Sequence, residues 1–326
     1  MQEKLDESLL LGEYLQIMVG KYRFILQMEN ACHLPEHKSS ALRGGMGEML
    51  LQMNCIRDRK CDHCPYEEEC IIRRIMYSKM RIRPDFMSAG DSVGYVIDCE
   101  DRREEFAAGD ELVFDLLLFG RSQVYLGEIL RAFKRLGRYG LGKDNAEYTI
   151  KSVRGYYGEW ICEEGKIHPE KAFPLKIGEY VAGRKRKFRT QNSELRLRSA
   201  TPLSLKFGGE IVKEFHADAI LRACERRLYM LNCYEGIDCG RIETEEPWPE
   251  ICSQKSEYTG VLRFSSTHGE KIRLEGVTGE AILRGVTEKQ LELLFAGELI
   301  HVGKNSSFGF GRYSIAEKDM GEDDEI

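Results

Sequence analysis

Four cysteines stand close together in the sequence, in the pattern C-x5-C-x2-C-x5-C. They are Cys55, Cys61, Cys64 and Cys70. The central pair resembles a knuckle that presents two thiolates to one tetrahedral ion, and four protein ligands leave no open coordination position. We therefore expect a structural zinc ion here. An iron–sulfur cluster and uncoordinated surface cysteines are the alternatives, and His63 can substitute for one ligand.

A second stretch with useful chemistry is the glycine-rich loop at residues 301–313, which reads HVGKNSSFGFGRY. Glycine permits positive φ and lets backbone N–H groups approach an anion closely. The loop follows an expected helix and precedes an expected strand, an order that excludes a Walker A loop and a dinucleotide fingerprint. A polymer phosphate fits such a loop, while tight packing of helix against strand is the alternative. The residues expected to bind the phosphate are Gly303, Lys304, Asn305, Ser306, Ser307, Gly309 and Gly311.

The glycine pattern occurs a second time, earlier in the chain. Residues 139–143 read YGLGK and match FGFGR at residues 308–312 type for type: aromatic, Gly, apolar, Gly, basic. Both copies follow an amphipathic helix pattern and precede a strand pattern. An internal repeat of this kind indicates a fold with two similar halves.

Apolar periodicity predicts the same order of elements in both halves of the chain. The first half has strands at residues 13–28, 94–99, 111–118 and 147–153, and helices at 41–50, with Ser39 or Ser40 as N-cap, and 122–135. The second half has strands at residues 194–206, 258–264, 271–277 and 312–316, and helices at 216–234 and 288–297, with Thr287 as N-cap. Each half reads β-α-β-β-α-β, the order of a ferredoxin-like domain.

The predicted fold class is therefore α+β, with two tandem ferredoxin-like (RRM-like) domains and a four-cysteine insert in the first. The expected segments are a first domain at residues 1–155 with the insert at 55–70, a basic linker at 156–193, a second domain at 194–318 and an acidic tail at 319–326.

Composition fits a globular protein of two domains. The chain has 326 residues, of which 42% are hydrophobic and 31% charged, and its formal net charge is −6. No apolar run approaches the roughly 18 residues that a membrane span needs. The N-terminus lacks a basic-then-apolar signal pattern, so we expect a cytoplasmic location without a membrane partner.

Positive charge is concentrated in one run despite the acidic total. This run can neutralise phosphates and stack a base, although a solvated loop is the alternative. Its members are Arg184, Lys185, Arg186, Lys187, Phe188 and Arg189.

Several short motifs, taken in order, resemble a known family. They read ALRGGMG at residues 41–47, LLFG at 117–120, GLGK at 140–143, TPLSLK at 201–206 and HVGKNSSFGFG at 301–311. Together with the element order, they resemble the RAMP superfamily of CRISPR-associated proteins. Within it they are similar to the endoribonuclease that trims CRISPR precursor RNA (Cas-six), in a subgroup with a four-cysteine insert.

This resemblance implies metal-independent cleavage of CRISPR repeat RNA to mature guide RNAs. The 2′-hydroxyl attacks the adjacent phosphate and leaves a 2′,3′-cyclic phosphate and a 5′-hydroxyl, with no cofactor for catalysis. The implied partners are the repeat RNA and a CRISPR effector complex. The alternative function is a non-catalytic RAMP subunit that binds guide RNA in such a complex.

The resemblance also implies the catalytic residues. Similar proteins carry a catalytic histidine between the first strand and the first helix, where this chain has His37, the favoured candidate, and His33. Lys38 is adjacent, and Tyr22 on the preceding strand can orient or protonate a leaving group. His301 is the rival histidine, because it directly precedes the glycine-rich loop. Arg43 joins the basic run as an expected RNA contact.

Overall fold

The computed structural model describes residues 7–61, 63–80, 82–87, 92–188, 194–244, 246–265 and 270–318. Two compact units make up the chain. The unit called N-terminal here comprises Met18–Leu175 and Cys233–Gly236, and the C-terminal unit comprises Met1–Ile17, Lys176–Asn232 and Ile237–Ile326. Within the described ranges, no helix combines the length and apolarity needed to cross a bilayer.

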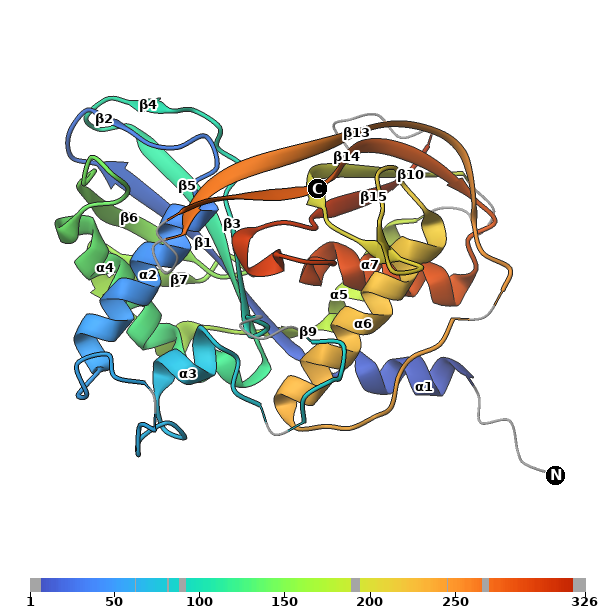
Figure 1. Cartoon of the computed structure of the whole chain (residues 1–326), viewed down its shortest axis with the longest axis horizontal. Helices are drawn as coiled ribbons and strands as arrows, with labels where there is room; N and C mark the ends of the chain where they lie inside the picture. Colours follow the sequence, from blue (N-terminus) through green and yellow to red (C-terminus); the bar gives the residue numbers. More distant parts are fainter. Residues whose placement is uncertain are drawn as a thin grey trace. The chain divides into compact units, whose positions relative to one another are not determined.

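The N-terminal unit is built on one antiparallel sheet with helices α2 and α4 packed against it (Figure 1). Its strand order is β3-β5-β1-β6-β7-β8. The elements are β1 (Met18–Met28), β2 (Cys32–His33), α2 (Ser39–Asn54), α3 (Ile71–Ile75), β3 (Tyr95–Asp98), β4 (Glu105–Phe106), β5 (Glu111–Phe119), η1 (Gly120–Tyr125), α4 (Leu126–Tyr139), β6 (Tyr148–Arg154), β7 (Trp160–Glu163), β8 (Lys166–Ile167) and η2 (Pro169–Lys171), with β9 (Leu175–Lys176) at its end.

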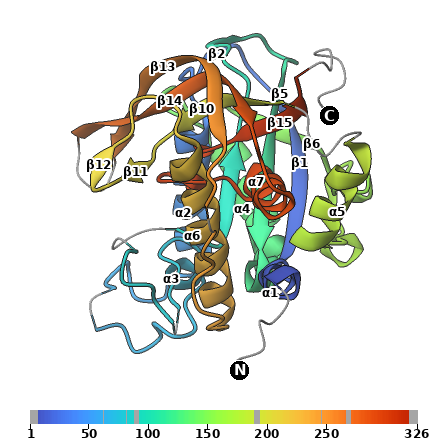
Figure 2. The same cartoon turned by 90° about the vertical axis from the view of Figure 1, so that its right-hand side faces the viewer.

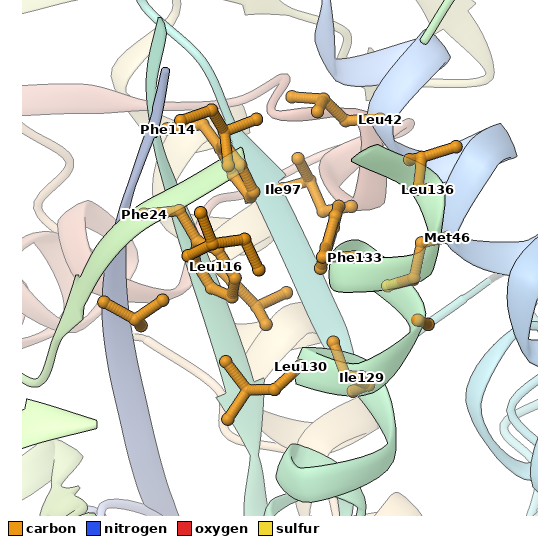
Figure 3. Packing of buried hydrophobic residues seen from close by; sticks show 14 of the residues in the cluster. Phe24, Leu42, Met46, Ile97, Phe114, Leu116, Ile129, Leu130, Phe133 and Leu136 are labelled. Carbon is orange, nitrogen blue, oxygen red and sulfur yellow. The ribbon is translucent and has the colours of Figure 1, made fainter. Parts of the chain in front are cut away.

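Three phenylalanines form the centre of the core between this sheet and α4 (Figure 3). The ring centroids of Phe24 and Phe114 lie 4.7 Å apart, and each is 5.1 Å from that of Phe133 on α4. Helices α2 and α4 also approach closely, since a Cβ at Gly45 would lie 2.5 Å from Cδ2 of Leu136. A side chain at position 45 would therefore push the two helices apart.

The C-terminal unit contains a second antiparallel sheet, with strand order β13-β14-β10-β15. Helices α6 and α7 lie on one side of it, as Figures 1 and 2 both show. The elements are α1 (Glu7–Tyr14), α5 (Ile177–Lys187), β10 (Leu195–Leu203), β11 (Lys206–Phe207), β12 (Glu210–Ile211), most of α6 (Ala217–Glu235), β13 (Glu250–Ser265), β14 (Glu270–Arg284), α7 (Glu288–Ile300), η3 (Ser306–Phe308) and β15 (Tyr313–Glu317).

The predicted elements are present, with differences in their bounds. Thr287 is the N-cap of α7, as predicted, and its hydroxyl accepts from the N–H of Gln290. At α2, Ser39 is instead the first helical residue, and Lys38 is an N-cap without a side-chain capping bond. Residues 156–188, predicted to lie within a basic linker, contain β7, β8, β9 and α5.

The predicted strand at residues 13–28 begins too early, because Tyr14 belongs to helix α1 and β1 starts at Met18. The hydroxyl of Tyr14 donates to the carbonyl oxygens of Cys239 at 2.6 Å and Gly240 at 3.1 Å. These partners are more than 220 residues away in sequence. A local pattern of apolar residues cannot anticipate such a tertiary contact.

We predict that Phe133→Ala lowers the free energy of unfolding by about 3–5 kcal/mol, because it leaves a cavity among the three rings. Urea unfolding followed by circular dichroism measures this change. The control is Val124→Ala, whose side chain is 76% exposed and whose loss should change stability by about 0.5 kcal/mol at most. Equal losses in the two variants would contradict the assigned core.

Candidate functional site

The loop between β1 and α2 carries the two histidines of the predicted catalytic set. His37 is half-buried, and its Nε2 lies 3.8 Å from Oε1 of Glu36. Burial lowers the pKa of His37, nearby Arg102 and Lys38 lower it further, and Glu36 opposes them. A lowered pKa keeps the imidazole neutral at pH 7, and a neutral imidazole can accept a proton.

His33 has the opposite electrostatic environment. It lies on β2, and its Nδ1 is 2.9 Å from Oε1 of Glu105 on the paired strand β4. This hydrogen bond raises the pKa of His33, whose side chain remains exposed. Two histidines of one loop thus have pKa values shifted in opposite directions, the arrangement that suits one base and one acid.

Lys38 is fully buried, and its ammonium is bound by backbone oxygens. It donates to the carbonyl groups of Glu36, Asp101 and Arg103, with the Asp101 contact at 3.0 Å. Its Nζ also lies 5.4 Å from the ring centroid of Phe106. These contacts hold the start of α2 against the segment between β3 and β4, so the structure gives Lys38 a positioning role.

Tyr22 is a core residue of β1, and its hydroxyl donates to Oε1 of Gln123 at 2.8 Å. Burial raises its pKa well above the usual value for tyrosine. Six residues separate it from the end of β1 at Met28, roughly 20 Å at the rise of a strand. The structure therefore does not bring Tyr22 to the histidine loop.

Two arginines of the N-terminal unit differ in their relation to this loop. Arg43 is half-buried on α2, and its Nη2 donates to Oγ of Ser92 at 3.0 Å. Arg102 lies close enough to His37 to lower its pKa, and the sequence analysis did not select it. The adjacent pair Arg102 and Arg103, just before β4, was the available signal.

His301 lies in the C-terminal unit, at the C-cap of α7 with φ of +55°. It is 3% exposed, and its Nδ1 lies 3.2 Å from the carbonyl oxygen of Phe310. Since a carbonyl only accepts, Nδ1 carries the proton in this contact. The imidazole thus joins the two ends of the glycine-rich loop.

The glycines of this loop allow close packing within the loop and against the chain that follows β10. Gly311 has φ of +76°, and a Cβ there would lie 1.8 Å from the carbonyl oxygen of Val302. Gly303 has φ of +83°, and a Cβ there would lie 2.7 Å from the carbonyl oxygen of Ser204. Tight packing, the alternative interpretation of the loop, therefore accounts for these two glycines.

The remaining loop residues form the short helix η3, with Asn305 in the left-handed conformation before it. Ser306 and Ser307 are buried, whereas Lys304 is exposed. The N–H of Lys304 donates to the carbonyl oxygen of Ser204 at 2.9 Å, and its side chain is more exposed than that of Arg312, the other cation of the loop. Lys304 is thus the loop residue best placed to meet an anion.

The basic run divides into paired and exposed residues. Arg184 forms a two-pronged ion pair with Glu298 on α7, with Nε to Oε2 at 3.0 Å. Lys185 bridges Glu288 and Glu292 on the same helix at 2.6 Å each. These two cations therefore hold α5 on α7.

The rest of the run begins with Arg186 and Lys187, which are exposed and have no side-chain partner among the described residues. Phe188 packs its ring 4.8 Å from that of Phe295. Arg189 lies outside the described residues. Arg186 and Lys187 are therefore the described members of the run that are available to a phosphate.

The four cysteines follow α2 as free thiols. Burial raises the pKa of Cys61, Arg73 opposes this effect, and Cys55, Cys70 and Cys64 raise the pKa further, so the four sulfurs are electrostatic neighbours. The backbone N–H of Arg59 donates to Sγ of Cys55 at 3.3 Å. In the described part of the chain, no three His, Cys, Asp or Glu side chains are arranged to hold a metal ion.

Comparison with known proteins gives two family matches. Residues 197–313 match the family described as CRISPR-associated endoribonuclease Cas6, and residues 15–172 match a family described as an N-terminal domain. An uncharacterized protein of Archaeoglobus fulgidus is 24% identical over 288 residues, covering 87% of this chain and 93% of that protein.

Two solved structures match most of this chain at low sequence identity. A chain of the partial Cas6-RT-Cas1–Cas2 complex is 11% identical, with a TM-score of 0.55 over 93% of this chain. The alignment covers 46% of that chain, so the present chain spans less than half its length. The Cas6 of Thermus thermophilus is 13% identical with a TM-score of 0.48, covering 92% of this chain and 99% of that one.

Arg184 and Arg186 allow a matched comparison, because Arg184 is an ion-paired member of the basic run and Arg186 an exposed one. Arg184→Ala leaves Glu298, whose side chain is 12% exposed, without its guanidinium partner. We predict a loss of about 3–5 kcal/mol in the free energy of unfolding at pH 7. Burial already raises the pKa of Glu298, so the loss should shrink as pH falls and the carboxyl takes up a proton. Arg186→Ala should change stability by about 0.5 kcal/mol at most. Urea unfolding of both variants measures the two changes, and equal changes would contradict the assigned pairing.

Proposed function

Because the chain belongs to the family of CRISPR-associated endoribonucleases Cas6, matched over residues 197–313, we propose that it cleaves CRISPR repeat RNA to produce guide RNAs. This family match is the observation that carries the proposal. The pair of oppositely shifted histidines in the N-terminal unit supports a catalytic rather than a purely binding role.

The proposed reaction needs no metal ion and no small-molecule cofactor. The 2′-oxygen of one nucleotide attacks the adjacent phosphorus and loses its proton to a base. The bond from phosphorus to the 5′-oxygen breaks, and this oxygen takes a proton from an acid. The products are a 2′,3′-cyclic phosphate and a 5′-hydroxyl, so atoms and charge balance without an external reactant.

His37 is the proposed base and His33 the proposed acid. The lowered pKa of His37 supplies a neutral imidazole, and the raised pKa of His33 keeps a proton available near pH 7. Arg102, which lies near His37, is the proposed source of positive charge for the phosphorane. His301 is the alternative catalytic histidine, and Lys304 with Arg186 and Lys187 are proposed contacts to the RNA backbone.

Both units are proposed to be ferredoxin-like domains, with the four-cysteine segment as an insert in the first. In each sheet the first long strand lies between the third and the fourth, in the orders β3-β5-β1-β6 and β13-β14-β10-β15. A helix connects the first strand to the second and the third to the fourth in both cases. This shared order is what supports a duplicated fold.

The direct test incubates purified protein in EDTA with the repeat RNA transcribed from the CRISPR array of its own genome. We predict one cut per repeat by the wild type. His37→Ala should slow single-turnover cleavage by about 100-fold or more while leaving RNA affinity unchanged, because it removes a proton acceptor rather than a contact. Wild-type protein that binds this RNA without cutting it would instead be the non-catalytic subunit of a CRISPR effector complex.

The pH profile separates the two histidines. A base must be neutral, so cleavage falls as pH drops through its pKa, and loss of the acid's proton produces a separate decline at higher pH. With His37 as the base, the acid limb of the single-turnover rate should have its midpoint below the ordinary histidine value of about 6.5. With His33 as the base, the raised pKa would move that midpoint above 6.5. The limb should persist in Arg43→Ala, whose guanidinium is bound to Ser92.

Zinc is proposed to be held by Cys55, Cys61, Cys64 and Cys70, and an iron–sulfur cluster is the alternative. The spacing C-x5-C-x2-C-x5-C and the N–H to sulfur bond at Cys55 support this set. Elemental analysis of protein purified without chelator should give one zinc per chain, and Cys61→Ser should lose the metal and some stability. Absence of both zinc and iron would refute the assignment. The proposed location is the cytoplasm, where a reducing environment keeps cysteines available as metal ligands.

A further inference from the structure

Helix α4 has two faces with opposite character. One face packs into the core through Ile129, Phe133 and Leu136, as Figure 3 shows. The opposite face is exposed and basic. We call it the basic face of α4, and it consists of Arg131, Lys134, Arg135, Arg138 and Tyr139.

The basic face borders a hollow of about 560 Å³. Met53, from the last turn of α2, is the remaining lining residue. The close approach of the two helices at Gly45 and Leu136 fixes this junction. The hollow therefore lies on the N-terminal unit and is lined by cations and one apolar side chain.

The cations nearest the C-terminal end of α4 are the ones available to bind a ligand. Arg131 pairs with Glu128, and Lys134 donates to the carbonyl oxygen of Gly165 at 3.0 Å. Among the described residues, Arg135 and Arg138 have no side-chain partner. The basic face is positively charged, although the chain as a whole has a formal net charge of −6. It should therefore attract a polyanion.

The length of the basic face fits consecutive phosphates of one nucleic-acid strand. Seven residues separate Arg131 from Arg138, which is about 10 Å along a helix. Along one unpaired strand, this length covers about two neighbouring phosphates. The stripe therefore matches a short stretch of backbone.

Tyr139 favours a nucleic-acid strand whose bases are unpaired. It is 56% exposed at the last position of α4. Gly140 follows with φ of +96°, and a Cβ there would lie 2.5 Å from the backbone of Asn145. The first glycine motif is thus a tight turn that ends the helix and leaves the tyrosine ring accessible. An exposed ring beside cations is a stacking site for a base outside a duplex.

We propose that the basic face of α4 binds a single-stranded segment of the substrate RNA, with Arg135 and Arg138 on phosphates and Tyr139 stacked on a base. This inference rests on the proposed function, because it takes the substrate to be RNA. It places a binding site on the N-terminal unit in addition to the histidine loop and the exposed basic run.

The test compares RNA affinity over a range of salt concentrations by fluorescence anisotropy. The probe is the repeat RNA with a 2′-deoxy nucleotide at the mapped cut, or the unmodified RNA if wild-type protein does not cut it. Arg135→Ala/Arg138→Ala should weaken binding about tenfold at 0.1 M salt and reduce the slope of log K against log salt by about 1.4, for two lost contacts to a single strand. The control, Lys206→Ala/Lys213→Ala, removes two exposed charges from the C-terminal unit and should leave the slope unchanged.

A second pair of variants tests the stacking contact. Tyr139→Phe keeps the ring and should bind as the wild type does, whereas Tyr139→Ala should bind about fivefold or more weakly. Unchanged affinity and slope in the double arginine variant would overturn the proposal and indicate that an acidic protein or nothing occupies this face. Wild-type protein with no affinity for the RNA would also overturn it. Cleavage is scored separately, so binding without cutting refutes the proposed reaction alone.

Discussion

The position of the first long strand inside each sheet is the constraint on which the candidate sites depend. Strand β1 is hydrogen-bonded to β5 along one edge and to β6 along the other, and β10 is held in the same way between β14 and β15. Such a strand cannot slip by one residue without breaking two ladders and turning its buried side chains outward. The loop with His33 and His37 therefore starts from a strand end whose position is fixed. Likewise, the chain after β10 supplies fixed carbonyl oxygens, among them Ser204, to the glycine-rich loop.

Charge pairing decides which basic residues are free to act. Arg184 and Lys185 precede Arg186 and Lys187 directly in the sequence, yet the first two are held by carboxylates on α7 and the last two face solvent. Lys38 likewise has the charge of a phosphate ligand and is bound by backbone carbonyl groups in the interior. Exposed cations without a carboxylate partner can attract a polyanion such as RNA, while the negative net charge of the chain opposes binding to other anionic surfaces.

The sequence predicted the element order because the apolar periods of the helices and strands are local signals. The same signals missed the strands within residues 156–175, since β7 and β8 are two to four residues long and depend on pairing, β7 with β6 and β8 with β7. Within the candidate site, the family resemblance identified His33 and His37 and favoured His37. It could not predict the opposite shifts in their pKa values, because burial and Arg102 lower the pKa of His37 and Glu105 raises that of His33, and both charged residues lie some 70 residues away in the chain. Arg102 was missed for the same reason.

The glycine motifs show the limit of reasoning from composition. At Gly311 and Gly140 a Cβ would meet the backbone of Val302 and of Asn145, so close packing requires the absence of a side chain at these two positions. Their repetition reflects a repeated position in the fold, the turn between α4 and β6 in one unit and between α7 and β15 in the other. What binds RNA is expected to be the exposed side chains near these turns, Lys304 in one unit and Tyr139 in the other.

The central claim is that the RNA supplies its own nucleophile while the protein supplies a base and an acid. A repeat RNA with a single 2′-deoxy nucleotide on the 5′ side of the mapped cut tests it most directly. The account predicts that wild-type protein binds this RNA as tightly as the unmodified one and leaves it intact at that position. Cleavage of the deoxy substrate at the same bond and at a similar rate would contradict the account, because a water molecule or a protein group would then be the nucleophile.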